Sequence, residues 1–263
     1  MRGRGSRARP APRQAGGVED DLRAQVAFGM RMLAAEGIFE YNVGHLSART
    51  PQGDTAYIVG HLHGTGRTLD QVVPEDIIAM DFTGKTVEGK SRGPGERFIH
   101  TELYKLRPDV GAVVHAHPPL ATAFSIAGVE ILPVNHRGTI FHPRVEIFED
   151  PRQIDTPALA AEVAKAMGDG FAILLRGHGC VCAGATVQEA CVTVLSLEKT
   201  AWLQLMASVV GKPRPIPVEF TDGRFIQGLE RHEFFANPWD FYVHKHGGDR
   251  GRPGPGRRGR VRG

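Results

Sequence analysis

Two histidines one residue apart, His115 and His117, lie in the stretch VVHAHPPLATAFS at residues 113–125. They end an apolar run, and in an extended segment alternate side chains point to the same face, so both imidazoles share one side. Two imidazoles in this arrangement can bind one divalent ion, as zinc and its neighbours prefer. On spacing alone, a strand end that happens to carry two histidines remains the alternative, and a metal site needs further ligands.

Two further residues extend this pair into a candidate site. His178, in LLRGHGCV, follows a second apolar run, and the glycines on either side let backbone or substrate approach it closely. A corner histidine bonded to backbone is the alternative there. Glu96, in GPGERFIHTELY, lies where a helix is expected to begin. It is either a first-turn charge, a proton donor and acceptor beside a metal, or a fourth ligand.

Alternating helices and strands have to position these residues. The periodicity of apolar residues and the Gly and Pro positions predict the elements of the first half of the chain. In order, we expect a helix from Val18 to Gly37, strands at Ala56–Val59 and Ile77–Met80, a helix from about Gly95 to Leu106, a strand at Gly111–His115, and a helix opened by Pro118 or Pro119.

The second half of the chain continues the alternation. Asp155 and Thr156 before Pro157 predict an N-cap and a helix that runs to about Met167. A buried strand follows in DGFAILLRGHG, and Thr186 begins a stretch of 24 residues that are mostly good helix formers. The short strands and hairpin-like turns favour a mixed or antiparallel sheet over a doubly wound parallel one. Nucleotide binding has no local support, since the sequence has neither a GxGxxG after a strand nor a P-loop.

The two ends of the chain differ in composition from the middle. Residues 1–17 and 247–263 consist largely of Arg, Gly and Pro, and we expect them to be disordered tails around one catalytic domain at residues 18–246. An RNA- or phosphate-binding arm is the alternative. The tails hold eleven of the 32 Lys and Arg but one of the 29 Asp and Glu. The middle of the chain is therefore acidic, which argues against a nucleic-acid partner.

Targeting signals and cysteines bear on the compartment. The N-terminal arginines are not followed by the apolar region of a signal peptide, and no apolar stretch approaches the ~20 residues of a membrane span. The three cysteines are odd in number, and Cys180 and Cys182 lie too close together to staple a fold. We expect a cytoplasmic protein with no membrane partner, in which these two thiols are core residues rather than metal ligands.

Three motifs, taken in order, resemble one protein family. ERFIHTELYKLRPDVGAVVHAHPPLATAFS at 96–125 and LLRGHGCVCAGATVQEA at 174–190 resemble the class II aldolase/adducin family, and GHLSAR at 44–49 is similar to its early substrate-loop motif. The likeness covers roughly residues 20–211. It implies an α/β protein with the class II aldolase-like α/β/α fold, in which helices flank a central, mainly antiparallel sheet. It also implies a homotetramer with active sites between subunits.

The resemblance also implies roles for single residues. His115, His117 and His178 would hold one divalent metal ion per subunit, either Zn, Mn, Fe or Co, and Glu96 would be the catalytic acid and base. Tyr242 is a further candidate proton donor, because family members often bring a C-terminal tyrosine to the site. His100, one turn after Glu96, is interpreted as a supporting or packing histidine.

The sequence departs from the members of the family that act on sugar phosphates. Those members generally carry Asn in a GNxSxR motif and small hydroxyl residues before the glutamate, whereas this chain has His45 and Pro94-Gly95. Proline offers neither a hydroxyl nor an N–H to phosphate. Arginine suits bidentate capture of a planar carboxylate, so we expect a small carboxylated substrate. The candidate substrate-binding residues are His45, Ser47, Arg49, Arg92 and His136.

The branch of the family with GHLSAR-type motifs resembles decarboxylases of hydroxylated aromatic dicarboxylates. We therefore expect a divalent-metal-dependent carbon–carbon lyase, a decarboxylase of a phthalate-like acid in which Glu96 or a metal-bound water protonates the carbon that loses CO₂. An aldolase or epimerase of a hydroxy-ketone or sugar phosphate is one alternative, and a non-haem iron oxygenase on the same fold is another. A non-catalytic, adducin-like scaffold is the last, and such a protein would be expected to lose the metal histidines.

Overall fold

The computed structural model of the chain describes residues 18–247. Apart from Gly247, the two expected tails at 1–17 and 247–263 lie outside the described residues. No helix within 18–247 has both the length and the apolar character that crossing a membrane requires.

A single large sheet forms the centre of the molecule. It has eight strands in the order β4-β3-β2-β1-β5-β8-β7-β6, and every neighbouring pair is antiparallel except β6 with β7. The predicted mainly antiparallel sheet is thereby confirmed. The strands are β1 (His45–Arg49), β2 (Thr55–Val59), β3 (Ile77–Asp81), β4 (Thr86–Glu88), β5 (Ala112–Ala116), β6 (Glu146–Phe148), β7 (Ala172–Leu175) and β8 (Gly179–Gly184).

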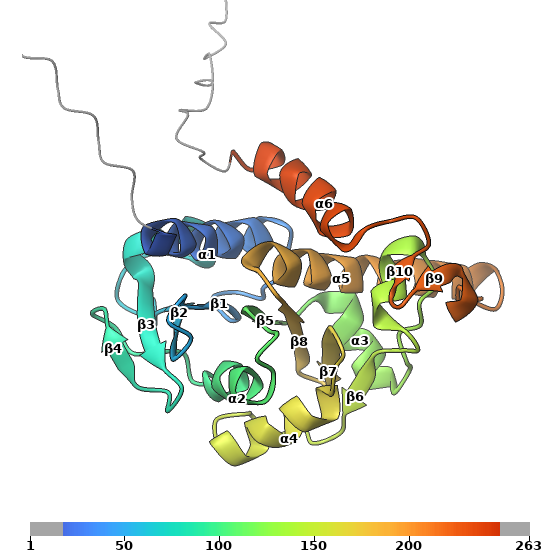
Figure 1. Cartoon of the computed structure of the whole chain (residues 1–263). Coiled ribbons are helices and arrows are strands. Elements are labelled where there is room, and N and C mark those ends of the chain that lie inside the picture. Colours follow the sequence, from blue (N-terminus) through green and yellow to red (C-terminus); the bar gives the residue numbers. More distant parts are fainter. Residues whose placement is uncertain (1–17, 248–263) are drawn as a thin grey trace, which may run out of the picture.

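Helices cover both faces of this sheet, which confirms the α/β/α layering (Figure 1). The first face packs against α1 (Val18–Ala35), α3 (Pro119–Ala127) and the long α5 (Val187–Val210). The opposite face packs against α2 (Phe98–Leu106) and α4 (Pro157–Met167). A small hairpin of β9 (Thr221–Asp222) and β10 (Phe225–Ile226) precedes α6 (Arg231–Lys245), which lies against α5.

The central strand β5 decides on which face the chemistry lies. Val114 packs in the core under α1 and α5, whereas Val113 packs in the core with α2 and α4. Side chains alternate along a strand, so His115 shares the α2 face with Val113. Strand β1 pairs with β5 so that His45 stands opposite His115, and β8 pairs on the other side with Val181 opposite His115. The sheet therefore brings His45 and His115 together beside α2.

The helix starts agree with their sequence signals. Thr156 accepts a hydrogen bond from the Leu159 N–H at the start of α4, and Thr186 accepts one from the Glu189 N–H at the start of α5. Two other boundaries differ from expectation. Helix α2 begins at Phe98, three residues later than predicted, because residues 95–97 form a turn. The GHLSAR stretch, expected as a loop motif, contributes strand β1, since pairing with both β2 and β5 satisfies its backbone.

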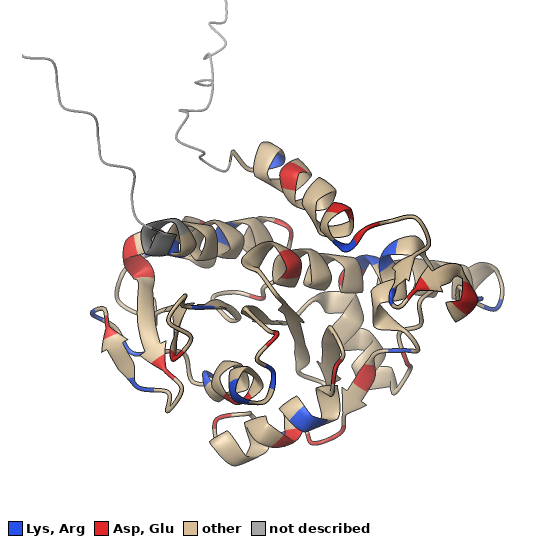
Figure 2. Cartoon of the chain, in the orientation of Figure 1, with Lys and Arg blue, Asp and Glu red and all other residues tan. Residues whose placement is uncertain are grey.

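Charged residues of both signs are spread over the helices and loops around the sheet (Figure 2). The strands β5, β7 and β8 carry no Asp, Glu, Lys or Arg, as their burial requires. Helix α6, which the sequence did not predict, is attached by Lys245 and His246, whose side-chain nitrogens lie 2.7 and 2.5 Å from Glu36 Oε1. Trp239 adds an edge-to-face contact with Phe28 of α1.

Candidate active site

Three imidazoles meet beyond the adjoining ends of β5 and β8. His115 is fully buried at the end of β5, His117 follows it, and His178 lies in the turn before β8. The ring centroids are 4.9 to 5.1 Å apart, and the candidate ligand atoms of the three residues all lie within 4.8 Å of one another. The structure thus brings together the three histidines that the sequence named as metal ligands.

The glycines around His178 allow this close approach. Gly177 adopts φ 63°, a left-handed conformation in which the β7–β8 turn closes with the His178 N–H bonded to the Leu175 carbonyl at 3.0 Å. A Cβ atom on Gly179 would collide with the Ala116 carbonyl and with the His117 ring. A glycine is therefore needed at 179 for β8 to pair next to the histidine-bearing end of β5.

The hydrogen bonds of His115 show that the cluster fits a cation. Its Nδ1 lies 3.0 Å from the Cys180 carbonyl oxygen, which accepts only, so Nδ1 carries a proton and Nε2 is the nitrogen that faces the cluster. That Nε2 lies 3.2 Å from His117 Nε2 and 3.2 Å from Glu96 Oε2, and His178 Nε2 lies 3.5 Å from the same oxygen. Candidate ligand atoms thus converge on one space, and the bond from His115 Nδ1 to a backbone carbonyl orients the ring as such bonds do for histidines in metal sites.

Glu96 is held at the edge of this cluster. It lies in the turn that leads into α2, is buried, and accepts a hydrogen bond from the Ile154 N–H at 3.0 Å through its second carboxylate oxygen. Burial alone would raise its pKa, but His115 and His178 outweigh that effect and hold the pKa of the Glu96 carboxyl well below its usual range. Burial and the two neighbouring imidazoles lower the pKa of His117 to about 4, which keeps it in the neutral form that binds metals.

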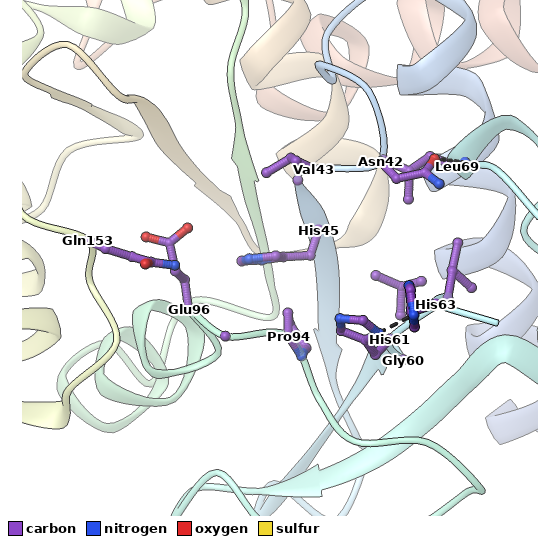
Figure 3. A pocket seen from close by; sticks show the side chains of 14 residues that line it. Asn42, Val43, His45, Gly60, His61, His63, Leu69, Pro94, Glu96 and Gln153 are labelled. Carbon is purple, nitrogen blue, oxygen red and sulfur yellow. Dashed lines mark hydrogen bonds between the residues drawn. The ribbon is translucent and has the colours of Figure 1, made fainter.

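A cavity of about 320 Å³ opens beside the cluster and meets it at Glu96 and His45. In Figure 3 the His45 ring points toward the Glu96 carboxylate, with Gln153 beside that carboxylate and His61 and His63 on the far side. Within the described part of the chain, no lysine, arginine, serine or threonine lines it. The lining residues are Asn42, Val43, Gly44, His45, Val59, Gly60, His61, Leu62, His63, Leu69, Pro94, Gly95, Glu96 and Gln153.

Behind the cavity wall, His45 belongs to a chain of buried side chains. His45 Nδ1 lies 2.6 Å from His100 Nε2, His100 Nδ1 lies 2.6 Å from Ser47 Oγ, and Ser47 Oγ lies 2.7 Å from the Tyr104 hydroxyl. Burial lowers the pKa of His100 to about 3 and that of His45 well below its usual range, and it raises the pKa of Tyr104. Ser47 is thus a partner of His100 rather than a lining residue.

The remaining predicted site residues lie elsewhere in the single chain. The Arg49 guanidinium bonds the backbone carbonyls of Val110, Gly53, Tyr104 and Arg107 and does not line the cavity. Arg92 is exposed, and its carbonyl accepts the His61 N–H. His136 is exposed at the start of a 3-10 helix. Tyr242 lines a different cavity, between α5 and α6, with Glu36 and Glu198.

Several contributors were not predicted from the sequence. Tyr104 follows His100 at helical i,i+4 spacing, and this periodicity would have placed Tyr104 on the same helix face as His100. The Cys180 carbonyl, the Ile154 N–H and Gln153 had no sequence signal, because a backbone group or a lone glutamine becomes part of a site only through the fold.

The sequence matches the model of the protein family that these motifs and this geometry suggest. The model described as Class II Aldolase and Adducin N-terminal domain matches residues 24–205. The chain is a member of this family. Its resemblance to the decarboxylase-like branch is also confirmed: it is 34% identical over 199 residues to 3,4-dihydroxyphthalate decarboxylase of Arthrobacter keyseri, covering 72% of this chain and 79% of that protein.

Aldolases are found among the relatives of this family member as well. It is 31% identical over 169 residues to L-fuculose phosphate aldolase of Methanocaldococcus jannaschii, with 64% of this chain and 87% of that protein covered. The solved structure of L-fuculose 1-phosphate aldolase from Glaciozyma antarctica superposes with a TM-score of 0.72 over 90% of this chain and 95% of that one, at 24% identity. Family and relatives together indicate a lyase, with a histidine and glutamate cluster that suits a divalent metal.

Proposed function

We propose that this protein is a carboxy-lyase that removes CO₂ from a hydroxylated aromatic carboxylic acid. The observation that carries the proposal is the cavity beside Glu96, where imidazoles and Pro94-Gly95 stand and the described lining offers no lysine, arginine or hydroxyl side chain to a phosphate. The similarity to a 3,4-dihydroxyphthalate decarboxylase over most of the chain supports the same choice.

The residues of the chain supply the proton transfers. With a hydroxyl ortho to the scissile carboxylate, the Glu96 carboxylate accepts the hydroxyl proton and returns it to the ring carbon that bears the carboxylate. The bond from that carbon to the carboxylate then breaks, its electron pair passes into the ring and onto the hydroxyl oxygen, CO₂ leaves, and one solvent proton restores the hydroxyl. The Ile154 N–H, 3.0 Å from Glu96 Oε1, keeps the carboxylate aimed at the cavity.

His115, His117 and His178 are the residues that would hold one divalent ion per subunit, whether Zn, Mn, Fe or Co. When bound, such an ion supplies a Lewis acid that stabilises negative charge on a substrate oxygen. The burial of His115 and the bond of its Nδ1 to the Cys180 carbonyl keep its Nε2 on the site side.

The test is a direct comparison of substrates. Purified protein supplied in turn with Mn²⁺, Fe²⁺, Co²⁺ and Zn²⁺ is incubated with 3,4-dihydroxyphthalate or with L-fuculose 1-phosphate, and CO₂, aldehyde and oxygen are followed. We expect CO₂ from the aromatic acid, no aldehyde and no oxygen uptake. Aldehyde release without CO₂ would make the protein an aldolase, to which its 31% identity with a fuculose phosphate aldolase lends some weight. Oxygen uptake would indicate an oxygenase, and no turnover with no bound metal would indicate a scaffold.

We further propose that the active form is a homotetramer, as the family resemblance predicts. The last part of α5 supports contacts between copies of the chain, since Trp202, Leu205, Met206, Val209 and Val210 expose apolar side chains there, with Val210 87% exposed. The molar mass in solution tests this, and a monomer that is fully active would contradict it.

A further inference from the structure

The hydrogen bonds that join the buried side chains behind His45 all run from donor to acceptor in one direction. Within residues 18–247, Ser47 Oγ is the hydrogen-bond partner of the Tyr104 hydroxyl, and Tyr104 is 1% exposed, so solvent does not reach it. A buried hydroxyl proton without an acceptor is costly, so Tyr104 donates to Ser47. Ser47 has one proton of its own, and its other partner is His100 Nδ1 at 2.6 Å, so Ser47 donates to His100.

The same donor-to-acceptor order continues through the imidazoles of His100 and His45. A neutral imidazole carries one proton, and since His100 accepts at Nδ1, its proton is on Nε2, which lies 2.6 Å from His45 Nδ1. His45 therefore accepts at Nδ1 and carries its own proton on Nε2. That both rings are neutral agrees with their burial, 0% exposed for His100 and 5% for His45, which lowers both pKa values.

The remaining N–H of His45 faces the site. His45 lines the cavity, its ring points toward Glu96 in Figure 3, and potential ligand atoms of His45, Glu96 and His115 lie within 4.8 Å of one another. By composition this group could also hold a metal. A nitrogen that bears a proton, however, has no lone pair for a cation. The donor-to-acceptor order of these hydrogen bonds therefore excludes His45 as a metal ligand, unlike His115, His117 and His178.

We propose that Tyr104, Ser47 and His100 are positioning residues that hold His45 as a neutral Nε2–H donor, and that this donor binds an anionic oxygen of the substrate next to Glu96. This inference rests on the proposed function for the identity of the substrate. It assigns Ser47 an indirect role in substrate binding. It also gives a physical meaning to the histidine in GHLSAR, since a ring with two nitrogens can both receive a proton from behind and present one in front.

The test is a double-mutant cycle on the metal-loaded protein. His45→Ala removes the donor and is expected to raise KM about tenfold, and Ser47→Ala, which leaves His100 Nδ1 without its donor, is expected to raise KM about fivefold. Tyr104→Phe is expected to have a smaller effect in the same direction, since the serine hydroxyl remains. Metal content is expected to stay at the parent level in all three variants. Because Ser47 acts through His45, the double variant should bind no more weakly than His45→Ala alone.

Two controls keep structural loss apart from loss of the donor. Thr101→Ala removes another buried hydroxyl from α2, and Tyr57→Phe removes the hydroxyl of another buried tyrosine, and neither residue belongs to the chain behind His45. Neither control should change KM. The inference would be overturned if the KM increases of His45→Ala and Ser47→Ala multiply in the double variant, if neither substitution changes KM, or if His45→Ala loses the metal.

The same cycle measured as the Kd of phthalate needs no turnover. If the wild-type protein releases no CO₂ but the phthalate cycle shows the expected non-additivity, the proposed reaction fails and the role of His45 stands. If CO₂ is released and the two losses multiply, the reaction stands and the role of His45 fails.

Discussion

The two sides of the candidate site are built in different ways. The half proposed to hold the metal, called the metal half, consists of Glu96, His115, His117 and His178. Its histidines lie at or next to the ends of paired strands and Glu96 lies in the turn before α2. The Cys180 carbonyl accepts from His115, and the Ile154 N–H donates to Glu96. The loop half, residues 60–68, carries His61 and His63 with exposed side chains. Buried residues held by paired strands are fixed in position, whereas an exposed loop can change its contacts without disturbing the sheet.

Removing a ligand from the metal half should have the largest effect. His178→Ala leaves two imidazoles, and we expect loss of bound metal together with a fall in kcat of about a thousandfold, since a Lewis acid contributes several kcal/mol. Metal analysis and CO₂ release measure the two effects. His232→Ala, which removes an exposed imidazole of α6, is the matched control. A variant that keeps its full metal content would show that His178 is not a ligand.

Replacing the proposed proton carrier by a side chain of the same shape should have the second-largest effect. Glu96→Gln retains the acceptor for the Ile154 N–H but cannot shuttle a proton, so kcat is expected to fall about a hundredfold or more with metal still bound. Glu102→Gln, on the neighbouring turn of α2, is the control for the change of charge. Loss of metal from Glu96→Gln would instead assign Glu96 as a fourth ligand.

Removing a residue that supports the metal half from behind should have a smaller effect than removing a residue of that half. Glu198 accepts hydrogen bonds from the Leu120 and Ala121 N–H groups at 3.0 and 2.9 Å and so caps α3 directly after His117. We expect Glu198→Ala to weaken metal binding about tenfold and to lower the free energy of unfolding by about 1 kcal/mol.

A second cap separates these two effects. Glu189 accepts from the Ala185 N–H at the start of α5, away from the site, and Glu189→Ala should lower stability by a similar amount without changing metal affinity. Metal titration and chemical denaturation of both variants check the comparison. Equal metal affinities in the two would show that α3 does not position His117.

The loop half should give the smallest change. Because the side chains of His61 and His63 are exposed, His61→Ala and His63→Ala are expected to shift KM by about two- to fivefold and to leave stability within about 0.5 kcal/mol of the parent. Steady-state kinetics with two aromatic acids of different substitution sharpen this comparison, since the loop variants should change the ratio of the two KM values. A fall in metal content would instead show that His61 or His63 contributes to metal binding.

Local signals account for what the sequence predicted well. Caps such as Thr156 and Thr186 act within four residues, so they marked α4 and α5 almost to the residue. The three histidines and Glu96 were recognised because their motifs occur in a familiar order along the chain. Their assignment as metal and catalytic residues stays a prediction that the geometry supports.

Long-range pairing accounts for what the sequence did not predict. The partnership of Ser47 with Tyr104 joins residues 57 apart, and it exists only because β1 pairs with β5 in a register that turns Ser47 toward α2. Arg49 was expected to bind substrate, but the β1 register aims it at backbone carbonyls instead. Its role, and those of Arg92, His136 and Tyr242, stay predictions, since the single chain does not bring them to the cavity.

The position of β5 at the middle of the sheet has a consequence for how the protein matures. His115 reaches its place only when β5 has paired with β1 on one side and with β8 on the other, and its bond to Cys180 spans 65 residues. Contacts of such sequence separation form late, after slow closure of long loops. A nascent or damaged chain therefore lacks the cluster of His115, His117 and His178 until its sheet is closed, and under the proposed function an ion bound there would stabilise only chains that have finished folding.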